Sequence, residues 1–159
     1  MSTLSVDTIQ GQTTAANVKM PAGHIVATYH HSIDPGSQST TSATLVETGL
    51  TITLTPKYQN SKFLMWASMH ECYIGAAQKA IGLVFAKNGT RLFDTDNATI
   101  GYSASVYNYF NVNLHGMDTP NTTSQITYSV MVRSIYPPQV VNWCGDNTPS
   151  FLTVMEMAQ

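Results

Sequence analysis

The side chains that could bind a metal ion or move a proton are few in this sequence, and they are scattered along it. The five histidines are His24, His30, His31, His70 and His115. Two of them are adjacent, and neighbouring residues of a strand point to opposite faces, so that pair does not chelate one ion. One histidine from each copy of a trimer could meet on the threefold axis and bind a metal there. The default expectation is that the histidines are exposed or hydrogen-bonded and hold no metal.

The carboxylates and the nucleophiles form no catalytic motif either. Residues 94–97, Asp-Thr-Asp-Asn, resemble the start of a calcium loop, but the glycine and the distal glutamate of such a loop are missing. A glycosidase needs two facing carboxylates, and no pair stands out. The sequence has no G-x-S-x-G motif, no cysteine-nucleophile signature and no glycine-rich phosphate loop. We therefore predict that the protein is not an enzyme and needs no cofactor, with a glycan-cleaving enzyme as the outside alternative.

The two cysteines, Cys72 and Cys144, are expected to be buried free thiols made in a reducing cytosol. A disulfide between them would need facing strands, and the sequence leaves that pairing open. The opening residues have neither the charged nor the apolar region of a signal peptide, which agrees with synthesis in the cytosol.

Glycan binding is the one chemistry for which the sequence offers candidate residues. Lectin-like sites place aromatic rings beside asparagine, aspartate or glutamine, often on loops. Side chains of these types occur in the second half of the chain, and they are the candidate receptor contacts: Tyr102, Asn142, Trp143 and Asp146. The more frequent role of a residue such as Trp143 is to fill a core or an interface, and that alternative stays open.

The elements that would position these residues are strands, and residues 61–74 form the longest of them. Apolar side chains fall on both faces of this stretch: Phe63, Met65, Ala67 and Met69 on one, Leu64 and Trp66 on the other. A strand that is apolar on both faces is buried on both. We therefore expect it in the middle of a sheet, or between a sheet and a partner subunit.

Residues 103–114 make a second long strand with two different faces. Val106, Phe110, Val112 and Leu114 share the apolar face. The opposite face is aromatic and polar without formal charge, and consists of Tyr107, Tyr109, Asn111 and Asn113. Such a face suits a trimer interface, because tyrosine buries a large area and still forms hydrogen bonds. An ordinary exposed sheet face is the alternative.

The complete pattern predicts an all-β fold. Lys87-Asn88-Gly89-Thr90 is a hairpin signal, because Asn-Gly readily adopts the positive φ angles of a type I′ turn. Residues 151–157 are apolar on both faces and should be paired inside a sheet, since a free edge of that kind invites aggregation. We count about eight to ten short strands between turn-rich loops, which favours a jelly-roll-like β-sandwich, with a small closed barrel second.

Residues 1–22 differ from this pattern. Leu4, Val6 and Ile9 give one short apolar stretch, and a polar, turn-rich segment follows it. A segment with so little apolar content does not fold alone, so we expect an extended N-terminal arm that docks on another surface. The β-sandwich domain then comprises residues 23–159.

Charge excludes several classes of partner. Only 10% of the residues are charged and the net charge is −2, without a basic run. Nucleic acid and anionic membranes are therefore not expected partners, and no apolar run is long enough for membrane insertion. A surface with so few charges can gain solubility by being buried in an oligomer or a larger particle.

Three stretches together resemble a known family. STLSVDTIQ followed by TTAANVKMPAG resembles the start of many tail-fibre-like virion structural proteins of marine and other tailed bacteriophages. LTPKYQNSKFLMWASM resembles the beginning of the central strand in that family, and SFLTVMEMAQ resembles its closing strand. The resemblance extends over nearly the whole chain.

The resemblance implies a homotrimeric sandwich module in the virion, made in the cytoplasm of the bacterial host. The leading expectation is a tail fibre or fibre tip that contacts a host surface glycan or protein. Leu4, Val6 and Ile9 in the arm would then attach it to other virion proteins. Typical fibres are far longer, so a capsid decoration, cement or head-fibre protein that stabilises the particle is the alternative.

Overall fold

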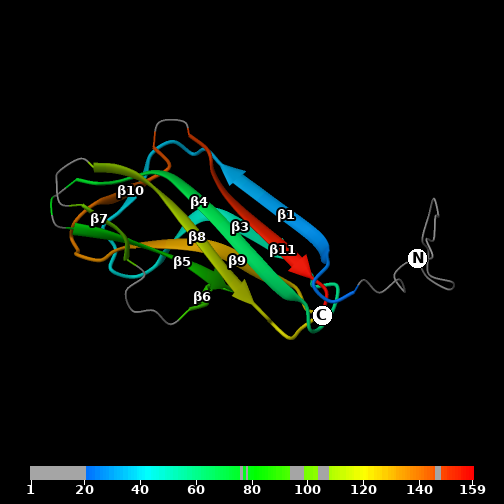
Figure 1. Ribbon diagram of the computed structural model, residues 1–159. Coiled ribbons are helices and arrows are strands. Elements are labelled where there is room, and N and C mark those ends of the chain that lie inside the picture. Colours follow the sequence, from blue (N-terminus) through cyan, green and yellow to red (C-terminus); the bar gives the residue numbers. More distant parts are fainter. Residues whose placement is uncertain (1–20, 76, 78, 94–98, 104–107, 146–147) are drawn as a thin grey trace.

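The chain folds into a β-sandwich in the computed structural model (Figure 1). The structure describes residues 21–75, 77, 79–93, 99–103, 108–145 and 148–159, with the backbone alone for 99–103 and 108. Every regular element in these ranges is a strand. The larger sheet contains β1 (Ile25–Ile33), β2 (Gln38–Thr40), β4 (Lys62–Ile74), β8 (Asn108–Asp118), β10 (Val141–Trp143) and β11 (Ser150–Met157). The smaller sheet contains β3 (Val46–Leu54), β5 (Lys79–Lys87), β6 (Thr90–Arg91), β7 (Thr99–Ser103) and β9 (Ile126–Ser134).

The strand order is that of a jelly roll. In the larger sheet β11 lies between β1 and β4, and β8 pairs with β4. In the smaller sheet β9 lies between β3 and β5, and β7 pairs with β5. Two antiparallel sheets whose successive strands alternate in this way make the double Greek key of a jelly roll. The predicted all-β sandwich is therefore confirmed.

Strict alternation along the strands builds the core between the two sheets. Phe63, Met65, Ala67 and Met69 of β4 are fully buried, as predicted for one face of this strand. They pack against the inward residues of the smaller sheet, and the rings of Phe63 and Tyr128 approach to 5.6 Å between centroids. Each large side chain buried in this way contributes about 1.5–3 kcal/mol.

One residue too many interrupts β4. Met69 pairs with Val112 and Cys72 pairs with Phe110, so β4 spends three residues where β8 spends two. Glu71 takes up the difference with a positive φ of 47°. This β-bulge changes which residues face inward, and Cys72 and Ile74 enter the core where alternation from Met69 would have placed Glu71 and Tyr73.

The expectation that β4 is buried on both faces is wrong for the single chain. The strand does lie inside its sheet, but Leu64 and Trp66 on its second face are 38% and 55% exposed. No second layer covers this face, because the smaller sheet packs on the other one. The C-terminal strand agrees with its prediction, since β11 is paired on both sides.

Several predicted boundaries moved. Residues 38–40 and 99–103 were expected to be loops and are the short strands β2 and β7. The strand predicted over 103–114 is β8, which ends later, at Asp118. The hairpin at Asn88-Gly89 is confirmed, with φ of 51° and 74°.

A buried carboxylate ties the end of β11 to the loop before β4. Glu156 is fully buried, and its Oε1 accepts hydrogen bonds from the Lys57 backbone N–H and from the Ser61 hydroxyl, both at 2.6 Å. Two donors would be left without a partner if this side chain were removed.

We predict that Glu156→Ala lowers the free energy of unfolding by about 2–4 kcal/mol, because it strands these donors and leaves a cavity. Urea titration followed by tryptophan fluorescence measures it. Glu47→Ala, which removes an exposed carboxylate from β3, is the matched control and should cost about 0.5 kcal/mol or less. Equal losses in the two variants would contradict the structural role of Glu156.

Candidate functional site

The outer face of the larger sheet carries an exposed apolar cluster, formed by Leu64, Trp66 and Met117. Leu64 pairs with Met117 across β4 and β8, and Trp66 lies one pair further along the same face of β4. The exposed fractions are 38% for Leu64, 55% for Trp66 and 50% for Met117. Single exposed apolar residues are ordinary, but a group of large ones on adjacent pairs of a sheet marks a contact surface. We call these three residues the outer apolar cluster.

Polar and aromatic residues surround this cluster. His115 of β8 and Thr153 of β11 lie opposite Trp66 on its two sides. His30 of β1 continues the row, and its Nδ1 is 3.0 Å from the Thr153 hydroxyl. The face is therefore apolar at its centre and polar at its rim, which is the usual composition of a protein interface.

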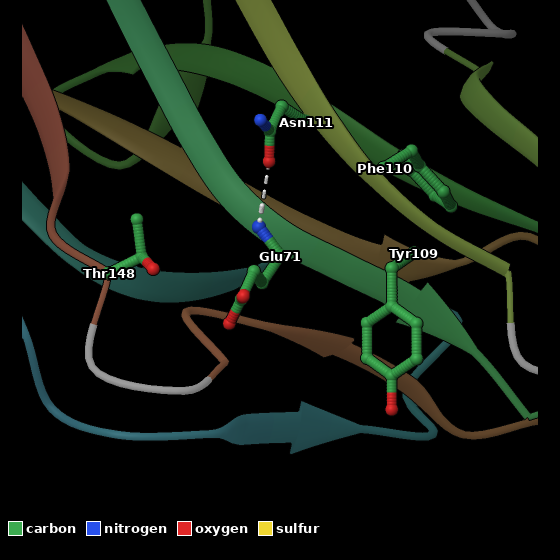
Figure 2. Close-up of a pocket in the computed structure, with 5 residues that line it drawn as sticks. All are labelled: Glu71, Tyr109, Phe110, Asn111 and Thr148. Atoms are coloured by element: carbon green, nitrogen blue, oxygen red, sulfur yellow. Dashed lines mark hydrogen bonds between the residues drawn. The ribbon is translucent and has the colours of Figure 1, made fainter.

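A hollow opens at the other end of the same sheet, at the bulge in β4. Its volume is about 490 Å³, and its lining comprises Glu71, Tyr109, Phe110, Asn111 and Thr148 (Figure 2). Figure 2 shows the Glu71 carboxylate and the Tyr109 ring pointing the same way from the sheet. The size is within the range of small-ligand sites.

The bulge determines how Glu71 is held. Its backbone N–H donates to Asn111 Oδ1 at 3.1 Å. Its Oε2 is buried and has no hydrogen-bond partner. Gly145 leaves room for this oxygen, because a Cβ there would lie 2.9 Å from Glu71 Oε2. A carboxylate oxygen without a partner and a non-glycine residue at positive φ both cost free energy, and such costs concentrate at functional sites.

The aromatic side of the hollow is a pair of tyrosines. Tyr109 is 59% exposed, and its ring centroid lies 5.1 Å from that of Tyr73 on β4. The pairing follows from the register, because these two residues face each other across β4 and β8. Tyr109 therefore presents a ring to solvent that is supported from one side.

The structure separates the residues predicted as receptor contacts. Asn142 and Trp143 lie in β10 with 6% and 4% exposure, so neither is placed to touch a receptor, and the core role of Trp143 is the observed one. The side chain of Tyr102, and Asp146 as a whole, lie outside the described residues.

Of the residues predicted for the trimer interface, Tyr109, Asn111 and Asn113 are exposed on one face of β8, opposite the inward Phe110, Val112 and Leu114. Tyr107 lies outside the described residues, as do Leu4, Val6 and Ile9 of the arm. The sequence analysis did not single out Glu71. Its only local signal is a charged residue inside an otherwise apolar strand.

The histidines have ordinary partners. His70 Nε2 lies 2.9 Å from the Ser68 hydroxyl, and His31 Nδ1 accepts from the Thr51 backbone N–H at 3.3 Å. Within the described ranges no group of three or more His, Cys, Asp and Glu is arranged to hold a metal ion. The described part of the chain also contains no helix of the length and apolarity that a membrane span requires.

Comparisons with known proteins identify no family. No protein-family model and no curated protein sequence matches this chain. Among solved structures, dimeric latent PorU from Porphyromonas gingivalis aligns over 89% of this chain with a TM-score of 0.42 and 10% identity. The VP2 subviral particle of infectious bursal disease virus aligns over 85% with a TM-score of 0.34 and 10% identity. This chain covers 14% of the first and 39% of the second, and likenesses at this level carry no functional conclusion.

Both cysteines are free and buried, as expected. Burial, and then the neighbouring Cys144, raise the pKa of the Cys72 thiol to about 12. Burial also raises the pKa of Cys144, although its Sγ donates to the Ser150 hydroxyl at 3.2 Å.

We predict that neither thiol reacts with Ellman's reagent in the native protein at pH 8. At that pH a thiol with a pKa near 12 is ionised to only about one part in 10⁴, and the side chain is also shielded from the reagent. Two thiols per chain should react after unfolding in guanidinium. Fast reaction of either one without denaturant would contradict the burial seen here.

Proposed function

We propose that this protein is a non-enzymatic structural protein of a bacteriophage virion, a homotrimeric tail fibre or fibre-tip module that contacts the host surface. Residues 1–22 attach it to the particle in this proposal. The observation that carries the proposal is the outer apolar cluster, which lies uncovered on a jelly-roll sheet. The resemblance of three sequence stretches to tail-fibre-like virion proteins supports the choice of particle.

The outer apolar cluster accounts for self-association. Trp66 and Met117 are each at least half exposed, and large apolar and aromatic residues of this kind dominate the binding energy of interfaces. The interface extends from the cluster along β8 through Asn113 towards Asn111 and Tyr109, on the face that the sequence pattern had selected. Contacts between unlike patches close into a ring of three when the rotation between copies is 120°.

Few charges favour burial over free solution. Only 10% of the residues are charged. In the described part of the chain one ion pair is present, between Lys87 Nζ and Asp118 Oδ2 at 2.8 Å. Because uncharged polar surface resists close packing less than charged surface does, the outer face suits contact with other copies and other virion proteins.

We predict that Trp66→Ser separates the copies without unfolding the chain. The Trp66 side chain makes little use of its own core, so the melting temperature of the isolated fold should hardly change, while each lost contact costs about 2 kcal/mol of association. Sedimentation equilibrium at roughly 50 µM chain should give trimer for the wild type and smaller species for the variant.

Tyr136→Ser is the control for this experiment, because Tyr136 is 46% exposed in the loop after β9, away from the outer face. It should remain trimeric. A wild type that is monomeric at this concentration, or a Trp66→Ser variant that stays trimeric, would count against the proposed interface.

Deletion of residues 1–20 tests attachment. We predict a soluble trimer that no longer enters virions, because the sandwich begins at β1 and does not use the arm in its sheets. Immunoblots of purified virions measure incorporation, and a chain with residues 11–20 replaced by Gly and Ser at equal length controls for spacing. Incorporation of the shortened chain would refute the attachment role.

Location on the particle separates the two virion roles. Immunogold labelling at the tail supports the fibre, whereas labelling over the head, with loss of capsid stability and normal adsorption in a mutant lacking the protein, supports the capsid decoration or cement protein.

A further inference from the structure

We propose that the hollow at the β4 bulge binds a neutral pyranose sugar, with Tyr109 stacking on the sugar ring and Glu71 accepting a hydrogen bond from its hydroxyls. The inference rests on the proposed contact with a host surface, and it names the ligand class and the site of that contact. Its residues are not the four that the sequence pattern had offered as receptor contacts.

Glu71 is the first argument. Its Oε2 is buried without a hydrogen-bond partner, while its backbone stands at a φ of 47° that glycine would adopt more easily. Neither feature stabilises the free protein. A ligand hydroxyl in the hollow would satisfy this oxygen, and a carboxylate is a strong acceptor for a hydroxyl donor.

Tyr109 is the second argument. A ring that is 59% exposed on a strand, and backed by Tyr73 at 5.1 Å, is a rigid platform that needs no reorganisation before binding. Aromatic rings carry an apolar face, and the C–H side of a pyranose is the apolar face of a sugar. The strand backbone fixes the distance between this platform and the carboxylate.

Asn111 completes the polar side. Its Oδ1 already accepts from the Glu71 backbone N–H at 3.1 Å, so the amide orientation is determined and its Nδ2 is the group left to donate. Thr148 adds a hydroxyl on the opposite wall. An acceptor, a donor and a hydroxyl around one hollow match the neighbouring hydroxyl groups of a sugar.

The charge of the lining selects a neutral ligand. Among the lining residues only Glu71 carries a formal charge at neutral pH, and no lysine or arginine lines the hollow. Sulfated, phosphorylated or carboxylated sugars would therefore be repelled by the Glu71 carboxylate. A single carboxylate is also too few ligands for a dedicated calcium site.

The test is titration of the ¹⁵N-labelled full chain with the methyl glycosides of glucose, galactose, mannose and N-acetylglucosamine, followed by NMR. At least one sugar should shift the Glu71 and Asn111 backbone signals and the Asn111 side-chain amide, with a Kd on the order of 1–10 mM for so small a ligand. Tyr109→Ala and Glu71→Gln should each weaken binding about tenfold or more. Glu71→Gln should not lower the melting temperature.

Matched variants control for general damage. Tyr136→Ala removes another exposed tyrosine, and Glu47→Gln neutralises an exposed carboxylate on β3 in the smaller sheet. Both should keep the wild-type affinity. The proposal is overturned if none of the four glycosides binds up to roughly 50 mM, if binding survives in Tyr109→Ala and Glu71→Gln, or if methylammonium or calcium chloride binds where the sugars do not.

The virion proposal fails in a different way. If the sugars do not bind but removal of residues 1–20 still excludes the trimer from virions, the sugar site alone is wrong. If a sugar binds with the expected variant pattern while the shortened chain still enters virions, the sugar site stands and the attachment role falls.

Discussion

The structure depends on the packing of the inner face of β4 against the smaller sheet. Phe63, Met65 and Met69 are fully buried there, and the ring of Phe63 meets that of Tyr128. Strands pair with β4 on both sides, so this strand fixes the position of β8 and β11 as well as its own. Because only one of its faces is used in this way, the other face of the sheet remains available for contacts outside the chain.

The bulge in β4 divides that outer face into two parts. Before it, alternation directs Leu64 and Trp66 outward and makes an apolar surface. After it, the extra residue reverses the alternation and directs Glu71 and Tyr73 outward instead. A single added residue thus places a carboxylate and a tyrosine pair beside an apolar patch on one sheet. The proposed contact between copies and the proposed sugar site are neighbours for this reason.

Much of the fold could be predicted from the sequence because its long strands alternate clearly. The inner face of β4, the position of β11 inside its sheet and the Asn88-Gly89 turn all follow from local pattern. The short strands β2 and β7 could not be found this way, since they are held by partners distant in the sequence. The bulge was missed because alternation around Glu71 reads equally well without it. The hollow joins Glu71, Asn111 and Thr148 from separate parts of the chain, and Trp143 was placed on the surface only as a residue type.

The two ends of the described chain meet at one pole of the sandwich. The Gly23 backbone N–H donates to the Ala158 carbonyl, and the Ala158 N–H donates to the His24 carbonyl, both at 2.8 Å. A force that pulled these ends apart would peel β1 from β11 one pair at a time. A force between the start of β1 and the bulge end of β4 would run along the strands and load their hydrogen bonds together in shear. The domain therefore resists tension best along its length, which is the direction in which a particle held at one pole and a cell held at the other would pull (Figure 1).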